Sequence, residues 1–381
     1  MSEYIIPILP LPYDLETKEI LRQVNRANRK LAELKGVALT IPNEQILISS
    51  LTLQEAKDSS EVENIVTTQD DLYRAELNLK ETVINASAKE VLNYRQAMQC
   101  GFALVRKTKL LTLNYVKRIQ EELESNKSGF RASPGTTLQN QHKEIVYTPP
   151  QSKVLIEQLM HNLEQYINDQ DMQDIDPLIK MAVIHHQFES IHPFYDGNGR
   201  TGRIISILYL VINNLLDLPI LYLSRYITHN KGEYYRLIQA VRDAGENNQK
   251  EWEQWILFML KGVEVTAEET IRLIKGISHL MAEYKSVLRP LFGRQYKHEL
   301  LNNLFYHPYT KIEFIQQDLL IQRKTATKYL DMIVETGLLK KVKIKHTNYY
   351  MNVRLIELFM NHQLPMADKN VEMIESVSLV K

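Results

Sequence analysis

The chain has 381 residues, with 46 Lys or Arg and 46 Asp or Glu, so its formal net charge is zero at pH 7. This balance provides no overall positive field for nucleic acid or for an anionic membrane, and the length predicts two or three domains. The single cysteine, Cys100, excludes an intrachain disulfide and is typical of a cytoplasmic protein.

The first residues have neither the basic segment nor the long apolar core of a signal peptide, and no later stretch is apolar enough to span a membrane comfortably. Three prolines within the first twelve residues predict an extended arm. Apolar residues at helical spacing predict a helix over 15–34, with Gly36 just beyond its end. Pro42 and Asn43 then predict the start of another short helix.

Residues 59–64 read Ser-Ser-Glu-Val-Glu-Asn, and the Ser60-x-x-Glu63 spacing is typical of a capping box at the start of a helix. Helical spacing follows over 91–104 and 111–123. The segment 129–150 is instead rich in Gly, Pro, Thr and Asn and closes on two prolines, which predicts a hairpin-like surface loop.

Residues 192–203 read His-Pro-Phe-Tyr-Asp-Gly-Asn-Gly-Arg-Thr-Gly-Arg. Gly197 and Gly199 flank Asn198, so the backbone can turn several N–H groups toward one point and form an anion-binding nest. The apolar run 204–211 predicts a buried helix directly afterwards, whose N-terminus also favours negative charge. The segment therefore predicts a polyphosphate site.

Four side chains of this segment suit phosphate chemistry. Arg200 and Arg203 lie three residues apart, so both guanidinium groups are expected to reach the same side and clamp phosphate oxygens. Asp196 is an oxygen ligand of the kind that Mg²⁺ uses when substrate phosphates supply the other ligands. His192 is expected to titrate near neutral pH and to accept a proton from an attacking hydroxyl.

Other ring side chains near this segment are expected to be structural. His185 and His186 stand seven and six residues before His192, which is not the spacing of a zinc site, so we expect buried, hydrogen-bonded histidines. Tyr234 and Tyr235 follow on a helical stretch, where tandem aromatics are core residues in most proteins.

The C-terminal third has its own pattern. An amphipathic helix is predicted over 266–288, ending before Pro290. Beyond it, a helix over 312–319, a turn, a helix over 323–336 and two β-like segments resemble a winged helix. Basic residues on its second helix and hairpin favour contact with DNA, although winged helices also dock proteins and lysines also protect a sheet edge. These residues are Arg323, Lys324, Lys328, Lys340, Lys341, Lys343 and Lys345.

The segment 192–203 resembles the signature of the Fic family, His-x-Phe-x-(Asp/Glu)-Gly-Asn-Gly-Arg-x-x-Arg, at every defined position. The resemblance implies a nucleotidyltransferase that moves AMP from ATP to a Tyr, Thr or Ser hydroxyl of itself or of a target protein. It implies that His192 is the general base, that Phe194 anchors the loop in the core and that Asp196 holds Mg²⁺.

The resemblance also implies the nucleotide contacts. Doc-like kinases carry Lys where this chain has Gly199, so Gly199 favours nucleotidyl transfer, and a Tyr-Tyr-x-x-Leu pattern implies that Tyr234 lines the adenine pocket while Tyr235 packs. Arg242 stands where some relatives use a polar residue to contact the nucleotide, and its contact stays open. The implied nucleotide-binding residues are Glu63, Gly197, Asn198, Gly199, Arg200, Thr201, Gly202, Arg203 and Tyr234.

An inhibitory pattern of the family, (Ser/Thr)-x-x-x-Glu-(Gly/Asn), is matched by Ser59, Glu63 and Asn64. The resemblance implies that Glu63 pairs with Arg203, the residue that should hold the γ-phosphate of ATP. It also implies that 129–150 is a flap on which the backbone of the target docks by strand addition.

We therefore predict a mainly α protein with a Fic-fold helical core, a small β-hairpin flap, an N-terminal helical lid and a C-terminal winged helix. Two alternatives stay open: a DNA-binding regulator that uses the Fic core as a nucleotide sensor, and a Fic enzyme that removes AMP from its targets. A homodimer, and DNA or protein bound through 291–360, are further open partners. The expected boundaries are 1–95 for the lid, 96–265 for the core, 266–290 for a connecting helix, 291–360 for the winged helix and 361–381 for a tail.

Overall fold

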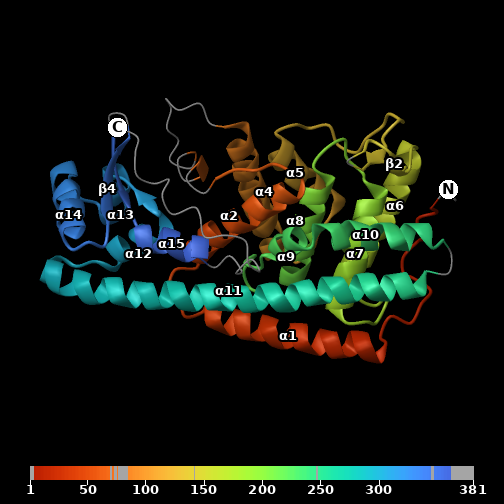
Figure 1. Ribbon diagram of the computed structural model, residues 1–381, viewed down its shortest axis with the longest axis horizontal. Helices are drawn as coiled ribbons and strands as arrows, with labels where there is room; N and C mark the ends of the chain where they lie inside the picture. The colour runs from red at the N-terminus through yellow and green to blue at the C-terminus, as the bar shows by residue number, and fades with distance from the viewer. Residues whose placement is uncertain are drawn as a thin grey trace. The chain divides into compact units, whose positions relative to one another are not determined.

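The computed structural model describes residues 4–68, 71–72, 75, 85–140, 142–245, 248–344 and 347–361. The described part is mostly helical and contains two small antiparallel sheets, as predicted (Figure 1). The chain divides into two units, Met1–Ser278 and His279–Lys381. Among the described residues, no helix has an apolar stretch long enough to cross a bilayer.

Ten described helices begin in the first unit, and their starts follow local chemistry. Asn43 accepts a hydrogen bond from the N–H of Gln45 at the start of the second helix, and Asp176 caps the helix whose first residue is Pro177. The helices are α1 (Lys18–Ala38), α2 (Glu44–Val62), α4 (Ala86–Thr108), α5 (Leu113–Glu124), α6 (Lys153–Asn168), α7 (Pro177–Ile191), α8 (Asn198–Ile212), α9 (Leu223–His229), α10 (Lys231–Asp243) and α11 (Gln249–Phe292).

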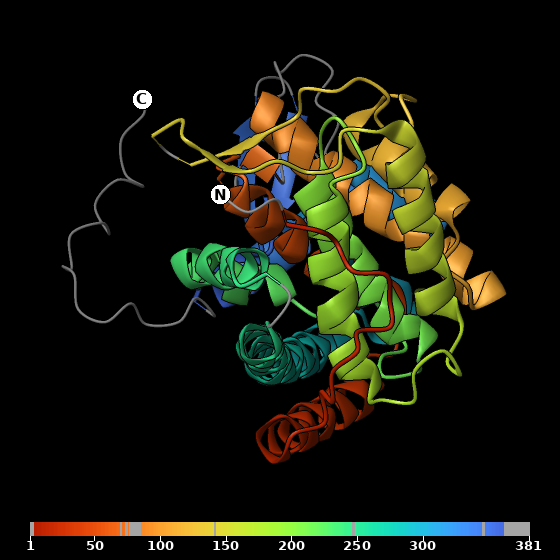
Figure 2. The same cartoon turned by 90° about the vertical axis from the view of Figure 1, so that its right-hand side faces the viewer.

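The core of this unit is built around α7 and α8, whose residues are buried along nearly their whole length. α8 packs against α2, α4, α5, α7 and α9. The N-terminal arm crosses α6 and α7 on its way to α1 (Figure 2). Leu9 exchanges two backbone hydrogen bonds of 2.9 Å with the side chain of Asn162, and Gln187 donates to the Pro7 carbonyl.

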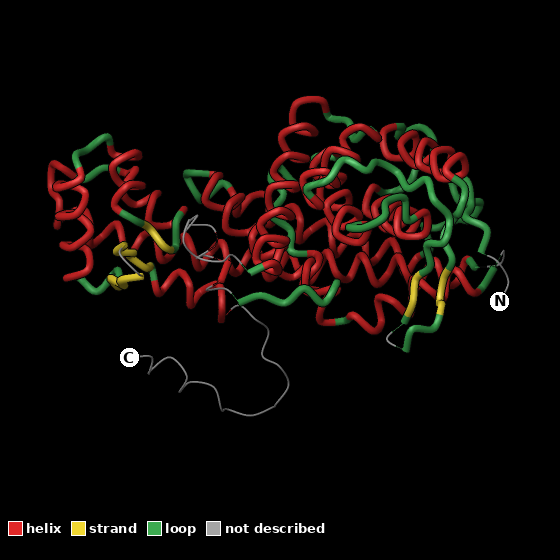
Figure 3. The backbone as a smooth tube through the Cα atoms, turned by 90° about the horizontal axis from the view of Figure 1, so that it is seen from above, coloured by secondary structure: helices red, strands yellow, loops and turns green. Residues whose placement is uncertain are grey.

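A short hairpin, the predicted loop at 129–150, joins α5 to α6. β1 (Leu138–Gln139) pairs antiparallel with β2 (Ile145–Tyr147), and the two strands lie side by side in Figure 3. At its C-terminal end, Tyr147 donates a 2.8 Å hydrogen bond to the carbonyl of Ser190 on α7.

Several boundaries differ from the sequence-based expectations. α1 continues through Gly36, because Lys35 is held by an ion pair of 2.9 Å with Asp217 and Leu34 is fully buried. α2 is 19 residues long rather than short. Ser60 and Glu63 lie at its C-terminal end, so the predicted capping box at a helix start is wrong.

Two further helices are longer than predicted. α8 begins at Asn198, six residues before the predicted apolar run, so the second half of the 192–203 segment is helical. α11 extends over 44 residues and includes Pro290 instead of ending before it. A proline removes only one N–H donor, and this helix ends two residues later at Phe292.

The second unit contains the predicted helix, turn, helix and pair of strands. Leu320 takes the left-handed conformation in the turn, with φ 55°. Three strands, β3 (Tyr309–Thr310), β4 (Lys340–Ile344) and β5 (Thr347–Met351), form an antiparallel sheet in the order β3-β5-β4. The elements are a 3-10 turn (Gly293–Gln295), α12 (His298–Tyr306), β3 (Tyr309–Thr310), α13 (Ile312–Leu319), α14 (Arg323–Glu335), β4 (Lys340–Ile344), β5 (Thr347–Met351) and α15 (Val353–Asn361).

The basic surface predicted on this unit is partly neutralised. Arg323 pairs with Glu313 at 2.6 Å, and Lys341 pairs with Asp331 at 2.7 Å. Lys324, Lys328, Lys340 and Lys343 are exposed, and Lys345 lies outside the described residues. DNA contact through this unit stays a prediction.

Candidate active site

The 192–203 segment forms the junction between α7 and α8. His192 ends α7 in the left-handed conformation, with φ 48°, and Gly197 precedes α8 with φ 76°. Between them, Phe194 is fully buried, and its ring centroid lies 5.3 Å from that of Phe130. The side chain of Asn198 closes this turn, because it accepts from the Phe194 N–H at 2.8 Å and donates to the Phe194 carbonyl at 2.9 Å.

A cleft of about 900 Å³ opens at this junction. It is bounded by the end of α2, the hairpin, the end of α7, the start of α8 and α10. The lining residues are Val62, Glu63, Asn64, Thr137, Leu138, Gln139, Asn140, Val146, Glu189, His192, Gly199, Arg203, Lys231, Gly232, Tyr234, Tyr235, Arg236, Ile238, Gln239 and Arg242.

His192 faces this cleft as a neutral imidazole. Burial, with the positive charges of Arg242 and Arg131, lowers the pKa of His192 from 6.5 to about 4. Its Nδ1 is buried and has no hydrogen-bond partner among the described residues. The expectation that this residue titrates near neutral pH is therefore wrong, because the folded chain desolvates it. The ring is free to accept a proton at pH 7.

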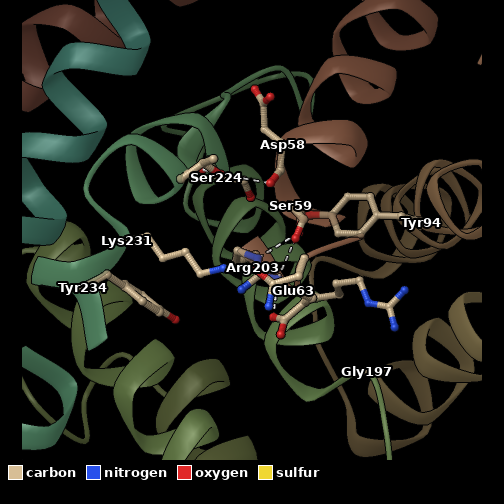
Figure 4. Close-up of polar contacts among 12 residues, drawn as sticks. Asp58, Ser59, Glu63, Tyr94, Gly197, Arg203, Ser224, Lys231 and Tyr234 are labelled. Carbon is tan, nitrogen blue, oxygen red and sulfur yellow. Dashed lines mark hydrogen bonds and ion pairs between the residues drawn. The ribbon is translucent and has the colours of Figure 1, made fainter. Parts of the chain in front are cut away.

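Arg203 is a buried cation of the cleft, with only 1 % of its side chain exposed. Its Nε donates to Ser59 Oγ at 2.8 Å, and its Nη2 donates to the Ser59 carbonyl at 3.0 Å and to Glu63 Oε1 at 2.8 Å (Figure 4). Burial by itself would raise the pKa of Glu63, but the charge of Arg203 holds it below the ordinary value. Glu63 is therefore a carboxylate that shares the guanidinium with Ser59.

Asn64, the third residue of the 59–64 pattern, also reaches the cleft. It follows α2 in the left-handed conformation, with φ 63°, and its Oδ1 accepts a 2.8 Å hydrogen bond from Lys231 Nζ. Lys231 is the first residue of α10. The end of α2 is thus tied to α8 through Arg203 and to α10 through Lys231.

The glycines of the segment leave room for carboxylates. A Cβ at Gly199 would overlap Glu63 Oε1 and would lie 3.0 Å from Arg203 Nη1. A Cβ at Gly197 would overlap Glu124 Oε1, and its positive φ disfavours other residues as well. Because the start of a helix attracts anions, the Glu63 carboxylate occupies the place at α8 that a phosphate would favour.

Arg200 does not join Arg203 in this cleft, so the expectation that both guanidinium groups reach the same side is wrong. Its side chain is 4 % exposed and pairs with Glu90 at 3.0 Å and Glu124 at 2.9 Å. These carboxylates come from α4 and α5, whereas Arg203 faces α2. The spacing between Arg200 and Arg203 in the sequence could not predict which carboxylates each guanidinium group would meet.

Thr201 and Gly202 also lie away from the cleft lining. Thr201 is fully buried. A Cβ at Gly202 would lie 3.1 Å from the Phe188 ring, so this glycine allows α8 to pack closely on α7. Thr201, Gly202 and Asn198 therefore contribute to the packing and hydrogen bonding of the α7–α8 junction.

Asp196 is the candidate metal ligand. It is exposed, and its Oδ1 accepts a 2.7 Å hydrogen bond from the Gly197 N–H. The described residues hold no cluster of three or more His, Cys, Asp or Glu that would bind a metal without help. One carboxylate next to a phosphate site fits the type of Mg²⁺ site that the substrate completes.

Tyr234 and Tyr235 both line the cleft but differ in exposure. Tyr234 is buried, and its hydroxyl lies 2.8 Å from His185 Nε2. Tyr235 is 45 % exposed, so the expectation that it only packs is wrong. His185 and His186 are fully buried and hydrogen-bonded, as predicted, the latter to the Ile238 carbonyl at 3.2 Å.

Sequence reasoning missed Glu189 as a cleft residue. It stands three residues before His192, one helical turn earlier on α7, and this spacing was a usable signal. Burial raises the pKa of Glu189 to about 7, and its Oε1 has no partner among the described residues.

Arg242, whose nucleotide contact the sequence left open, also lines the cleft. It is 5 % exposed, and its guanidinium carbon lies 3.9 Å from the centroid of the Tyr147 ring. Its Nε donates to Ser190 Oγ at 3.2 Å.

A helical core with a His-to-Arg segment of this form at a helix junction defines a Fic-type protein. Residues 21–103 match the profile described as Fic/DOC family N-terminal, and 110–210 match that of the Fic/DOC family. Residues 280–355 match the C-terminal domain of SoFic-like protein adenylyltransferases. The chain belongs to the Fic/DOC family.

Curated relatives match over short segments. Protein adenylyltransferase fic-1 of Caenorhabditis elegans is 35 % identical over 65 residues, which is 17 % of this chain and 13 % of that protein. The probable protein adenylyltransferase aq_aa38 of Aquifex aeolicus is 35 % identical over 82 residues, 22 % of this chain and 25 % of that protein. The matched segments thus span a quarter or less of these relatives.

Solved structures show the same fold at low identity. A Fic family protein from Desulfovibrio desulfuricans has a TM-score of 0.58 and 18 % identity, covering 90 % of this chain and 98 % of that chain. A Fic-domain protein from Bacteroides thetaiotaomicron has a TM-score of 0.54 and 16 % identity, covering 66 % of this chain and 97 % of that chain. These likenesses concern the fold alone.

Proposed function

We propose that this chain is a protein adenylyltransferase that transfers AMP from ATP to a hydroxyl of Tyr, Thr or Ser, on itself or on a target protein, and releases pyrophosphate. The curated relatives that match it are named for this activity. One observation carries the proposal: a neutral His192, the N-terminus of α8 and the buried Arg203 face the same cleft.

The residues divide the reaction between them. The imidazole of His192 accepts the proton of the acceptor hydroxyl while the hydroxyl oxygen attacks the α-phosphorus of ATP. The first N–H groups of α8, beside Gly199, bind phosphate oxygens, and Arg203 holds the γ-phosphate. Asp196 would hold Mg²⁺, which neutralises charge on the leaving pyrophosphate. Tyr234 and Tyr235 offer aromatic surface for the adenine.

Glu63 makes the described form an inhibited one. Its carboxylate occupies Arg203 Nη2 and lies against Gly199, where the terminal phosphates would bind. A triphosphate must displace it or bind with its γ-phosphate elsewhere, out of line for transfer. The fit of Ser59 and Asn64 around the same groups supports a built inhibitory contact.

The hairpin is the proposed docking site for the target. β1 and β2 form a two-stranded sheet, so each strand has an edge with which an extended peptide can pair. Leu138 and Val146 of the hairpin line the same cleft as His192. A peptide added here would bring its hydroxyl toward the imidazole.

The test uses ATP labelled at the α-phosphorus and the Glu63→Gly protein. We expect more label on protein than with the unmodified chain. Adding His192→Ala should abolish it, whereas adding His161→Ala, at an exposed histidine of α6, should not. Label that persists in the His192→Ala protein would show that the assigned base is wrong.

The same proteins decide the direction of the reaction. If AMP removal were the main activity, Glu63 would align the attacking water, and Glu63→Gly would stop hydrolysis of an AMP-modified protein. The proposed transferase instead gains labelling on this change.

A further inference from the structure

The N-terminal end of the hairpin contacts the 192–203 segment directly. We call residues 130–133, which precede β1, the flap root. Arg131 is fully buried, and its N–H donates to the Pro193 carbonyl at 2.8 Å. Its Nε donates to the His192 carbonyl at 2.7 Å and its Nη2 to the Ile191 carbonyl at 3.3 Å. One side chain of the flap root therefore holds the backbone at the proposed base.

Tyr195 makes the reverse contact, from the 192–203 segment to the flap root. Its hydroxyl oxygen accepts the N–H of Ala132 at 2.9 Å and the N–H of Ser133 at 3.2 Å. The side chain is 52 % exposed, so its ring contributes little to the core. Its specific contribution to the fold is therefore the hydrogen bonding of its hydroxyl to Ala132 and Ser133.

The hairpin needs such attachments, because strands of two and three residues are too few to hold a fixed position alone. At the other end of the hairpin, the Tyr147 hydroxyl is tied to the Ser190 carbonyl. The contacts of Arg131 and Tyr195 supply the attachment at the first end. Both attachments lead to residues within a few positions of His192.

We propose that Tyr195 and Arg131 form a clasp that fixes the register between the flap and His192, and so sets where an acceptor hydroxyl meets the imidazole. The role of the clasp in transfer rests on the proposed function, whereas its contacts are present in the structure without a substrate. A misplacement of about 1 Å between acceptor and base is enough to slow transfer strongly. Tyr195 and Arg131 are thus positioning residues.

A purely structural role for the two residues predicts different results. If they only stabilised the fold, Tyr195→Phe would leave the flap and the acceptor kinetics unchanged once the protein was folded. The clasp predicts instead that the flap root loosens while nucleotide binding stays the same, because neither residue lines the nucleotide cleft.

The first measurement is hydrogen exchange at the amides of Ala132 and Ser133. Losing their acceptor in Tyr195→Phe should speed exchange at both amides about fivefold or more. Tyr226→Phe, on α9, is the matched control, because its hydroxyl makes none of these contacts, and it should leave both rates unchanged. Unchanged exchange in Tyr195→Phe would overturn the proposal.

The second measurement is transfer between two copies of the chain. Labelled AMP is moved from ATP by the Glu63→Gly protein onto a His192→Ala copy as acceptor. Tyr195→Phe in the transferring protein should lower kcat/KM for the acceptor about fivefold to tenfold, with the KM for ATP unchanged. Equal losses for ATP and acceptor, or no loss, would contradict a positioning role.

The third measurement separates the charge of Arg131 from its geometry. The pKa of His192, followed by NMR, should rise in Arg131→Gln, because a facing positive charge is removed while Arg242, Glu63 and Glu189 remain. Arg131→Lys should keep that pKa low but still speed exchange at Ser133, because Lys cannot bind two carbonyls in the same geometry. A Lys variant with wild-type exchange would refute the clasp.

These measurements distinguish a failure of the proposed adenylyltransferase function from a failure of the clasp. If the Glu63→Gly protein transfers no AMP at all, the proposed function fails, and the exchange rates and the titration of His192 still decide on the clasp. If Arg131→Gln does not fold, Tyr195→Phe still decides, because it removes one hydroxyl from a side chain that is 52 % exposed.

Discussion

Releasing Arg203 from Glu63 should strengthen the binding of ATP and leave the binding of AMP unchanged. In the described form the guanidinium gives Glu63 a charge-assisted hydrogen bond of 2.8 Å from Nη2. After Glu63→Gly, two hydrogen bonds to Ser59 still orient the side chain. The freed Nη2 can then bind the γ-phosphate, which AMP lacks.

The magnitude follows from that single contact. A hydrogen bond to a charged group contributes about 1.5–3 kcal/mol. At 1.4 kcal/mol for each factor of ten, ATP affinity should rise about tenfold to hundredfold. Glu63→Gln should give a smaller gain, because the amide oxygen can still accept from Arg203 but carries no charge.

Calorimetric titration with ATP and with AMP, in the presence of Mg²⁺, measures both affinities. His192→Ala is included in every protein to prevent turnover. Glu61→Gly is the matched control, because this residue lies on the same helix and its carboxylate pairs with Lys57, at 3.9 Å, rather than with Arg203. Equal gains for ATP and AMP, or no gain for ATP, would refute the assignment of Arg203 to the γ-phosphate.

Two predictions concern pH. The rate of the Glu63→Gly protein should rise through an acidic limb no higher than the lowered pKa of His192, about 4, because this change removes a negative charge that raises that pKa. The rate should then stay level around neutral pH, and a limb near 6.5 in the rate profile would show that the imidazole is not desolvated. Burial raises the pKa of Glu55, hydrogen-bonded to Ser224, to about 8, above its ordinary 4.5. The contribution of this carboxyl to the free energy of unfolding is therefore complete below pH 4.5 and is lost as the pH rises toward 8. The reason is that Glu55 releases its proton at a lower pH in the unfolded chain than in the folded one. Urea denaturation at several pH values should show a loss of stability, and Glu55→Gln should make it smaller, because the raised pKa of Glu189 still contributes; an equal slope in both proteins would contradict the assignment.

The form of the 192–203 segment could be predicted because its chemistry is local. Gly197 takes a positive φ, the apolar run 204–211 lies within α8, and the imidazole and carboxylate lie within a few residues of the start of that helix. The 59–64 pattern was recognised from a family resemblance rather than from its spacing. Ser60 and Glu63 suggested a helix start, whereas they end α2.

Periodicity could not resolve α2, because this helix is buried on nearly every side. Thr52, Glu55, Ser59 and Ser60 are buried along with its apolar residues, so no polar face marks its orientation. An amphipathic pattern identifies a helix only when one face meets water. The partners that donate hydrogen bonds to Glu55 and Ser59 come from α4, α8 and α9.

By itself the sequence determined the helical class of this protein and the order of groups along its signature, because backbone turns and helix starts depend on neighbouring residues. Only the tertiary structure decided that Arg203 meets Glu63 while Arg200 meets Glu90 and Glu124, and that His192 stays neutral. The physical reason is that charge pairing and desolvation depend on groups that are distant along the chain and that only folding brings within a few ångströms.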